Sequence, residues 1–370
     1  MSAPDPASGA GRGAQSGTGP SRGGEAHAAA GRRSGRANIK DVAAAAGVSY
    51  QTVSRVINDH PHVKNSTREL VRAAIRELGF RPNRAAQALA GGSARSLTVV
   101  TPDTSLFGPH AALQGIALAA RLAGFPAGIQ VVESLPGSAP QEIIDATARS
   151  AEAGDAVIAI AWDEATIRAL AAVPPEIPVA AMVEAPPGDA GSGAPRTWID
   201  DRQAAGEATR YLLGLGHATV HYLGIPHWGG VSPRQAGWQS ALEAAGASVP
   251  DCQQCGWTAL SGYTAGRRLA ADPDVTAVLC GNDDVATGLM RAMHEAGRAI
   301  PQEVSIIGFD DTRVSEFLAP SLTTVRLDFT GLALSCFALL QAQLGSGASA
   351  PPAAQLQPQL IVRESTGSPR

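Results

Sequence analysis

Three polar residues early in the chain carry side chains that suit the edges of DNA bases. Tyr50, Gln51 and Arg55 fall on the first turn and a half of a helix predicted at Tyr50–Ile57. Positions i, i+1 and i+5 of such a helix can all face outward into a major groove. A glutamine amide pairs with adenine, and a guanidinium offers two donors to O6 and N7 of guanine. Taken alone, Tyr50 and Gln51 could equally be ordinary solvated surface.

Short polar side chains stand at the ends and flanks of the predicted helices. Hydroxyl and amide groups in such places suit contacts with phosphate oxygens, which position a protein on a duplex without specifying its sequence. The expected phosphate contacts are Ser49, Ser54, Asn58 and Thr67.

The helix that carries these residues is the second of a pair with helix-turn-helix spacing. The first helix is predicted at about Ile39–Ala46, with Asn38 as its N-cap. It ends at Gly47, which allows a tight turn, and Ser49 then caps the second helix. The alternative is a generic corner between two helices.

A third helix is predicted at about Thr67–Leu78. Ser66 and Glu69 have the spacing of a capping box, and Gly79 follows the last apolar position. The three helices need a small shared core, for which the expected residues are Val42, Ala46, Val48, Val53, Val56, Leu70 and Ile75.

Charge is distributed unevenly along the 370 residues, although the net charge is only −4. Residues 1–96 hold 14 Lys and Arg against 6 Asp and Glu, which leaves 15 and 27 for residues 97–370. The beginning of the chain therefore suits a polyanion and the remainder does not. Residues 1–36 are rich in Gly, Ala, Ser and Pro and are expected to form a disordered basic tail.

The segment from Ala46 to Asn58 reads AGVSYQTVSRVIN and resembles the recognition region of the lactose-repressor (LacI) family of bacterial regulators. The resemblance continues through the segment Arg81–Ala90, which corresponds to the family's hinge. Looser matches follow at Gly237-Trp238, Gly256-Trp257, Cys280–Asp283, Gly308–Asp311 and Asp328-Phe329.

This resemblance implies a second contact with DNA, in the minor groove. Leu89 would wedge between base pairs at the operator centre, together with Leu89 of a second subunit, and kink the duplex. Asn83 and Arg84 would hold the backbone alongside. The hinge is short and is expected to order only when something binds it. The alternative is that Leu89 merely packs on the larger part of the chain.

From Leu97 onward, short β-branched segments alternate with Ala-rich helical ones, which predicts parallel sheets with crossover helices. We expect two doubly wound α/β lobes like those of periplasmic sugar-binding proteins. A further strand is expected within Leu356–Arg363. The other strands are expected at Leu97–Thr101, Ile129–Val132, Ala156–Ile160, Val179–Val183, Val220–Gly224, Ala277–Cys280 and Val304–Phe309.

Such a pair of lobes would bind a ligand in the cleft between them. Sugars need planar donors and acceptors for adjacent hydroxyls and an aromatic face for their C–H side. The resemblance places family effector contacts at Arg234, Trp257, Asn282, Asp310 and Phe329. The alternatives are that Trp257 and Phe329 are core aromatics and that Asp310 is a helix N-cap.

Two features of the cleft depart from the family pattern. Leu327 stands where the lactose-responsive pattern has a glutamine, which changes the polar groups offered to a sugar. The loop before Arg234 also differs, and Glu184 is only a stand-in for the acidic residue expected after the strand Val179–Val183.

Other chemistries receive little support. Cys252 and Cys255 have metal or redox spacing, but no second pair or neighbouring histidine completes a site. His217 and His221 span a loop and a strand, so we expect them to be structural. There is no P-loop or nucleophile elbow, so neither a cofactor nor a metal is expected. Without an apolar segment of about 18–20 residues, we expect a cytoplasmic protein.

The sequence predicts a homodimeric repressor of carbohydrate-utilisation genes that a small sugar releases from operator DNA. A regulator with a co-repressor such as a purine is the first alternative, and a sugar-modifying α/β enzyme with an attached helix-turn-helix is a remote one. The expected parts are a disordered tail (1–36), a helix-turn-helix domain (37–81), a hinge and linker (82–96), an effector-binding and dimerisation domain (97–364) and a disordered end (365–370).

Overall fold

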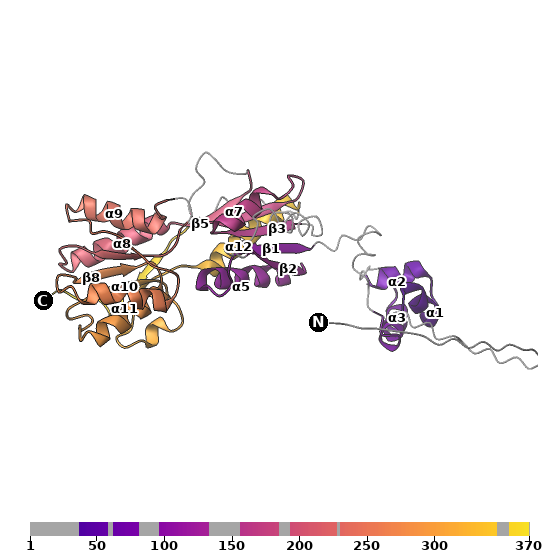
Figure 1. Cartoon of the computed structure of the whole chain (residues 1–370). Coiled ribbons are helices and arrows are strands. Elements are labelled where there is room, and N and C mark those ends of the chain that lie inside the picture. The colour runs from indigo at the N-terminus through magenta and orange to yellow at the C-terminus, as the bar shows by residue number, and fades with distance from the viewer. Residues whose placement is uncertain are drawn as a thin grey trace, which may run out of the picture. The chain divides into compact units, whose positions relative to one another are not determined.

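The computed structural model describes residues 37–57, 62–80, 96–132, 156–184, 193–227, 230–345 and 355–369. These residues fall into two units that divide between Gly92 and Ser93 (Figure 1). No helix in these ranges is long and apolar enough to span a membrane. The hinge segment lies outside the described residues, and so do the expected DNA contacts Asn58, Asn83, Arg84 and Leu89.

The described part of the first unit contains α1 (Ile39–Ala46), α2 (Tyr50–Ile57) and α3 (Asn65–Glu77). The first two have the predicted bounds. A capping box begins α1, because the Asn38 side chain accepts the backbone amide of Asp41 at 3.1 Å and the Asp41 side chain accepts that of Asn38 at 2.8 Å. The fully buried core residues are Val42, Ala43, Val53, Val56, Val71 and Ala74.

The third helix differs from its prediction in two respects. It begins at Asn65, so Ser66 lies inside its first turn, and no side chain caps it. Leu70, expected in the core, is 58% exposed. The reason is helical geometry: Val71 and Ala74 are three residues apart on the buried face, and Leu70 is rotated about 100° from Val71.

In the second unit, the first of two sheets has the strand order β11-β5-β4-β3-β1-β2, and the pairings are parallel. Its core strand β3 is buried on both faces, as expected for a parallel sheet covered by helices. The strands are β1 (Leu97–Thr101), β2 (Ala127–Val131), β3 (Ala156–Ala161), β4 (Val179–Val183), β5 (Arg196–Ile199) and β11 (Gln355–Leu356). The helices of this first lobe are α5 (Phe107–Leu122), α7 (Glu164–Ala171) and α12 (Phe329–Gln343).

The second sheet has the order β12-β10-β9-β8-β6-β7, and its β12 pairs antiparallel with β10. Its strands are β6 (His221–Gly224), β7 (Gln253–Gln254), β8 (Ala277–Cys280), β9 (Ser305–Asp310), β10 (Thr323–Arg326) and β12 (Gln359–Ile361). The helices of this second lobe are α8 (Asp201–Gly214), α9 (Pro233–Ala244), α10 (Ala259–Ala270), α11 (Asp283–Glu295) and the 3₁₀ turn η1 (Ser315–Phe317).

The chain passes between the two lobes at three places within the described residues: from β5 to α8, from β10 to α12, and from β11 to β12. The last passage corrects an expectation. The segment Leu356–Arg363 was expected to add one strand, but it is divided between β11 and β12, which join different sheets. Both lobes are therefore completed by residues from the end of the chain (Figure 1).

The expected disorder of residues 365–370 is wrong for residues 365–369. Ser365 is buried, its hydroxyl donates to the Ile306 carbonyl at 2.6 Å, and it accepts the Thr323 amide at 2.8 Å. The backbone amide of Ile306 donates to the Ser365 carbonyl. Small polar residues look like a solvated end in the sequence, but here they satisfy backbone groups of β9 and β10.

Candidate DNA-reading helix and effector pocket

The outward face of α2 carries the three residues predicted to read bases. Tyr50, Gln51 and Arg55 are exposed, whereas Val53 and Val56 of the same helix are buried in the core of the unit. The structure thus brings the three side chains to one side of α2, opposite the packing face. A helix exposed in this way can enter a major groove.

The turn before α2 fixes where that helix begins. Gly47 has φ +64°, and a Cβ at this position would meet nothing within 4 Å, so glycine is needed here for its backbone angle. The amide of Val48 then donates to the Ala43 carbonyl at 3.0 Å. Ser49 caps α2, because its hydroxyl accepts the Thr52 amide at 3.2 Å.

The expected phosphate contacts lie around this helix. Ser49 is exposed at its beginning, and Ser54 and Thr67 are half-buried on α2 and α3. Ser49 and Thr67 are close to the beginnings of α2 and α3, and Ser54 is in the middle of α2. Short hydroxyl side chains of this kind suit phosphate contacts that do not read bases.

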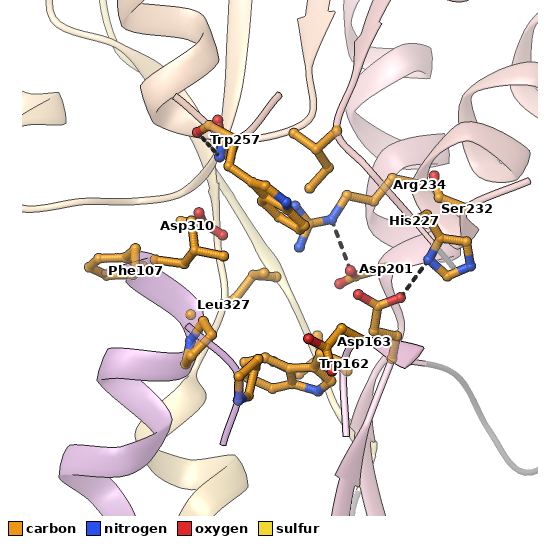
Figure 2. A pocket seen from close by; sticks show the side chains of 18 of the residues that line it. Phe107, Trp162, Asp163, Asp201, His227, Ser232, Arg234, Trp257, Asp310 and Leu327 are labelled. Atoms are coloured by element: carbon orange, nitrogen blue, oxygen red, sulfur yellow. Dashed lines mark hydrogen bonds and ion pairs between the residues drawn. The ribbon is translucent and has the colours of Figure 1, made fainter. Parts of the chain in front are cut away.

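In the second unit, a cavity of about 530 Å³ lies between the two lobes. It is at the carboxyl ends of the strands, where ligands bind in parallel α/β sheets. The residues predicted from the family resemblance all line it: Arg234, Trp257, Asn282, Asp310 and Phe329. Figure 2 shows Arg234, Trp257 and Asp310 around the cavity.

Arg234 is the most constrained polar group of this cavity. Its Nε donates to Asp201 Oδ2 at 2.8 Å, and its Nη1 donates to the Gly281 carbonyl. The guanidinium also lies over the Phe309 ring, 4.5 Å from the ring centre. The side chains of Arg234 and Asp201 are each only 12% exposed. This is a buried ion pair that presents a guanidinium edge to the cavity.

The electrostatics of this pair follow from its burial. Burial raises the pKa of Asp201, and Arg234 opposes that shift. Burial lowers the pKa of Arg234, but the carboxylates of Asp201 and Asp310 outweigh it, so its pKa lies above the ordinary value. Arg234 therefore stays charged in the cavity.

Asn282 and Asp310 follow consecutive strands of the second sheet. Asn282 is the N-cap of α11: its Oδ1 accepts the Val285 amide at 2.8 Å, and its Nδ2 donates to the Trp257 carbonyl at 3.0 Å. Asp310 is at the end of β9 with φ 108°. The alternative that Asp310 is a helix N-cap is wrong, because the next helical turn, η1, begins only at Ser315.

An aromatic cluster forms the wall contributed by the first lobe. The Phe329 ring centre is 5.5 Å from that of Trp162 and 6.1 Å from that of Phe107. Phe329 is only 7% exposed, so it belongs both to the core and to the cavity lining. Leu327, the departure from the family pattern, is also buried and lines the cavity beside this wall.

Sequence reasoning missed several residues that line the cavity. Glu184, the stand-in for the acidic residue expected after β4, does line it and pairs with one of the missed residues: His227 Nδ1 is 2.8 Å from Glu184 Oε2, and this contact joins the end of β4 to the end of β6 across the lobes. Trp162, Asp201 and His227 were not proposed. All three directly follow or nearly follow a strand, which was the available signal.

Behind the cavity, Asp283 holds the loop that follows Asp310. Its Oδ2 accepts the Thr312 amide at 2.8 Å and the Ser315 hydroxyl at 2.6 Å, and its Oδ1 accepts the Thr324 hydroxyl at 2.5 Å. Asp283 is 1% exposed, and burial raises its pKa to about 6 despite these hydrogen bonds. The carboxylate therefore links α11, η1 and β10.

The other motifs have structural surroundings. His217 is buried between the hydroxyls of Thr276 and Ser305, at 3.0 and 2.9 Å. Cys252 and Cys255 are not disulfide-bonded. In the described parts of the chain, no group of three or more His, Cys, Asp or Glu side chains is arranged to hold a metal ion.

Known proteins resemble both units. Residues 38–83 match the model "Bacterial regulatory proteins, lacI family", and residues 209–366 match "Periplasmic binding protein-like domain". The lactose operon repressor of Escherichia coli (strain K12) is 32% identical over 296 residues, which cover 79% of this chain and 80% of that protein.

Two solved structures are similar over most of their length. The lac repressor dimer bound to operator and the anti-inducer ONPF has a TM-score of 0.76 and 30% identity, and the match covers 90% of this chain and 100% of that one. The complex of the transcriptional regulator CelR with cellobiose has a TM-score of 0.62 and 27% identity, covering 89% and 100%.

Proposed function

The chain belongs to the lacI family of bacterial regulatory proteins, and we propose that it is a homodimeric, operator-binding repressor of carbohydrate-utilisation genes that a small sugar releases from DNA. One observation carries this proposal. The same chain has an exposed helix with Tyr50, Gln51 and Arg55 on its outer face and, in a separate unit, a cavity between two lobes. Such a chain can read DNA at one place and sense a ligand at another.

On DNA, Gln51 and Arg55 discriminate bases from the major groove, each by about 1–3 kcal/mol, with Tyr50 beside them. Ser49, Ser54, Asn58 and Thr67 contact phosphates. Leu89 wedges into the minor groove, and Asn83 and Arg84 hold the backbone next to it. Two-fold symmetry of the dimer then predicts a nearly palindromic operator.

In the cavity, Arg234 and Asn282 bind hydroxyl groups, Asp310 binds a further polar group of the ligand, and Trp257 and Phe329 pack against the C–H face of a sugar. The buried Arg234–Asp201 pair supports this role, because it presents a fixed guanidinium edge to the cavity. CelR, one of the similar structures, is bound to cellobiose. Because operator DNA lies in the cytoplasm of a bacterium, a repressor that binds it acts in the cytoplasm.

Ligand and DNA are linked by movement of one lobe against the other. The three connections between the lobes allow the lobes to rotate relative to each other. A ligand that contacts the cavity walls of both lobes favours one arrangement of the lobes. In the dimer, this arrangement separates the hinge segments and withdraws Leu89. A coupling of about 1–3 kcal/mol corresponds to a 5- to 150-fold change in DNA affinity.

The second lobe offers apolar surface to a second copy of the chain. Leu260, Val314 and Phe317 of this lobe are 73%, 57% and 78% exposed in the single chain. A C₂ dimer would bury these residues against the same surface of the partner.

A mobility-shift assay on a duplex selected from a random library tests the function. The full chain should prefer that duplex over random competitor at moderate salt, and a sugar effector should release it. A ligand that tightens binding would instead identify a co-repressor. Leu89→Ala should weaken binding and leave the base preference at the Gln51 position unchanged. Absence of any sequence preference would overturn the proposal.

A further inference from the structure

The cavity between the lobes is lined by many more acidic than basic side chains. Its only cations among the described residues are Arg234 and, when protonated, His227. Six carboxylates line the same cavity: Asp103, Asp163, Glu184, Asp201, Asp284 and Asp310.

The two cations are already committed to carboxylates. Arg234 bonds to Asp201, and His227 bonds to Glu184. Two of Arg234's nitrogens are used on Asp201 and the Gly281 carbonyl, and its guanidinium face covers Phe309. Little cationic capacity is left for an anionic ligand. A sugar phosphate or sugar acid would meet carboxylates without a counter-charge.

Asp310 and Asp284 remain without a cation of their own. Within the described residues, neither side chain has a hydrogen-bond or ion-pair partner. Burial raises the pKa of both carboxyls and most strongly that of Asp310, so the charged form of Asp310 lacks compensation from its surroundings, whereas Asp284 keeps contact with solvent. Arg234 is the nearest cation to Asp310 and partly offsets this effect, but it also serves Asp201 and Glu184. A cation supplied by the ligand would relieve this excess of negative charge.

The aromatic side chains point to the same kind of ligand independently of the carboxylates. Trp162 lines the cavity from the first lobe and Trp257 lines it from the second (Figure 2). Phe329 of the first lobe also lines it. Aromatic faces attract cations as well as the C–H face of a sugar ring, and tryptophan does so best. A ring that carries both C–H faces and an ammonium group would use both kinds of wall.

We infer that the effector of this cavity is an amino sugar in its cationic form, whose ammonium group binds Asp310 and Asp284 while its ring packs between the aromatic side chains. This inference rests on the proposed function, because it concerns the ligand of the same sensor site. The cavity should therefore bind amino sugars more tightly than neutral sugars, and anionic sugars least tightly.

Calorimetric titration of the full chain with matched sugars tests this inference. Glucosamine, galactosamine and mannosamine are each compared with the parent hexose, the N-acetyl derivative and the hexose 6-phosphate. At least one amine should bind about tenfold or more tightly than its neutral counterparts, as a charge-assisted hydrogen bond to a buried carboxylate implies. The phosphates should bind least.

Variants identify the carboxylates responsible. Asp310→Asn should abolish the preference of the protein for the amine, and asparagine tolerates the positive φ of this position. Asp284→Asn, at an exposed residue that tolerates substitution, should reduce the preference by a smaller factor. Asp251→Asn, an exposed carboxylate of the same lobe outside the cavity, is the matched control and should leave the preference unchanged.

The outcomes separate this inference from the function on which it rests. Equal or tighter binding of the neutral hexoses, tightest binding of a phosphate, or no binding by any amine would overturn the inference, provided that the same protein still prefers its selected duplex. Loss of duplex preference in the unmodified chain would overturn the proposed function instead. An amine preference that survives both Asp310→Asn and Asp284→Asn would also overturn the inference.

Discussion

The DNA-reading helix and the effector cavity present their recognition residues in opposite ways. Tyr50, Gln51 and Arg55 lie within six consecutive residues, are exposed, and depend on neighbours only through the packing of Val53 and Val56. The cavity assembles side chains from Pro102 to Leu332, and some of its polar groups, such as Arg234 and Asp201, are buried and bonded to one another. A change in the helix should therefore affect recognition alone, whereas a change in the cavity should affect stability as well.

Arg234→Ala should have the largest effect. It leaves Asp201 buried without its partner, which costs about 3–5 kcal/mol, and it removes the ligand's guanidinium contact. Hydrogen exchange should accelerate in α8 and α9 and remain unchanged in α1 to α3. Arg168→Ala breaks a half-exposed pair with Glu164 and is the control, with an expected change below about 0.5 kcal/mol. If Arg234→Ala and Arg168→Ala lowered the free energy of unfolding equally, the stability of the second unit would not depend on the cavity in the way that the comparison requires.

Asp283 should make the second unit pH-dependent. Its pKa is raised from 3.8 to about 6, so the native state binds the proton more tightly than the unfolded state. The contribution of Asp283 to the free energy of unfolding is fully present below about pH 4. It is lost as the pH rises through about 6, by up to about 3 kcal/mol. Urea unfolding of the unmodified chain and of Asp283→Asn at several pH values should show this difference. A constant difference across the range would contradict the prediction.

Arg55→Ala should affect recognition without affecting stability. Loss of its two donors should cost about 1–3 kcal/mol of discrimination at one base pair and leave the other positions unchanged. Competition among duplexes that differ at single positions measures this effect, and thermal unfolding provides the control. A large fall in stability would show that the exposed helix is as dependent on its surroundings as the cavity is.

Substitution of Gly47 should have the smallest of these effects, and this effect comes from the backbone angle in the first unit. Gly47→Ala should cost about 1–2 kcal/mol, because φ +64° is unfavourable for a residue with a Cβ. Gly47→Asn should cost less, since asparagine tolerates this region of backbone angles. Urea unfolding of the two variants distinguishes the angle from packing, because nothing lies near the missing Cβ. Equal losses would contradict this explanation.

The difference between the two regions also explains what sequence could predict. The caps at Asn38 and Ser49 and the turn at Gly47 are local signals, and they placed α1 and α2 correctly. The buried face of α3 depends on packing, and Leu70 was consequently assigned to the wrong side.

For the second unit, regular alternation predicts most of the inner strands but misses β5 and β10, which have four residues each. The shortest edge strands carry too few residues for a pattern. β7 and β11 have two residues each and owe their existence to the neighbouring strand. The family resemblance placed five residues in the cavity. Asp201 and His227 could not be inferred in the same way, because their meeting with Arg234 and Glu184 depends on which loops converge in three dimensions.

The late return of the chain to the first lobe has a consequence for synthesis. The ribosome completes the DNA-reading unit about 250 residues before it reaches α12, which takes roughly 12–50 seconds at ~5–20 residues per second. Neither lobe is complete until α12, β11 and β12 have emerged. A nascent chain thus carries its DNA-reading unit well before its effector cavity is complete. A stop codon just ahead of α12 would release a DNA-reading unit that no metabolite can control.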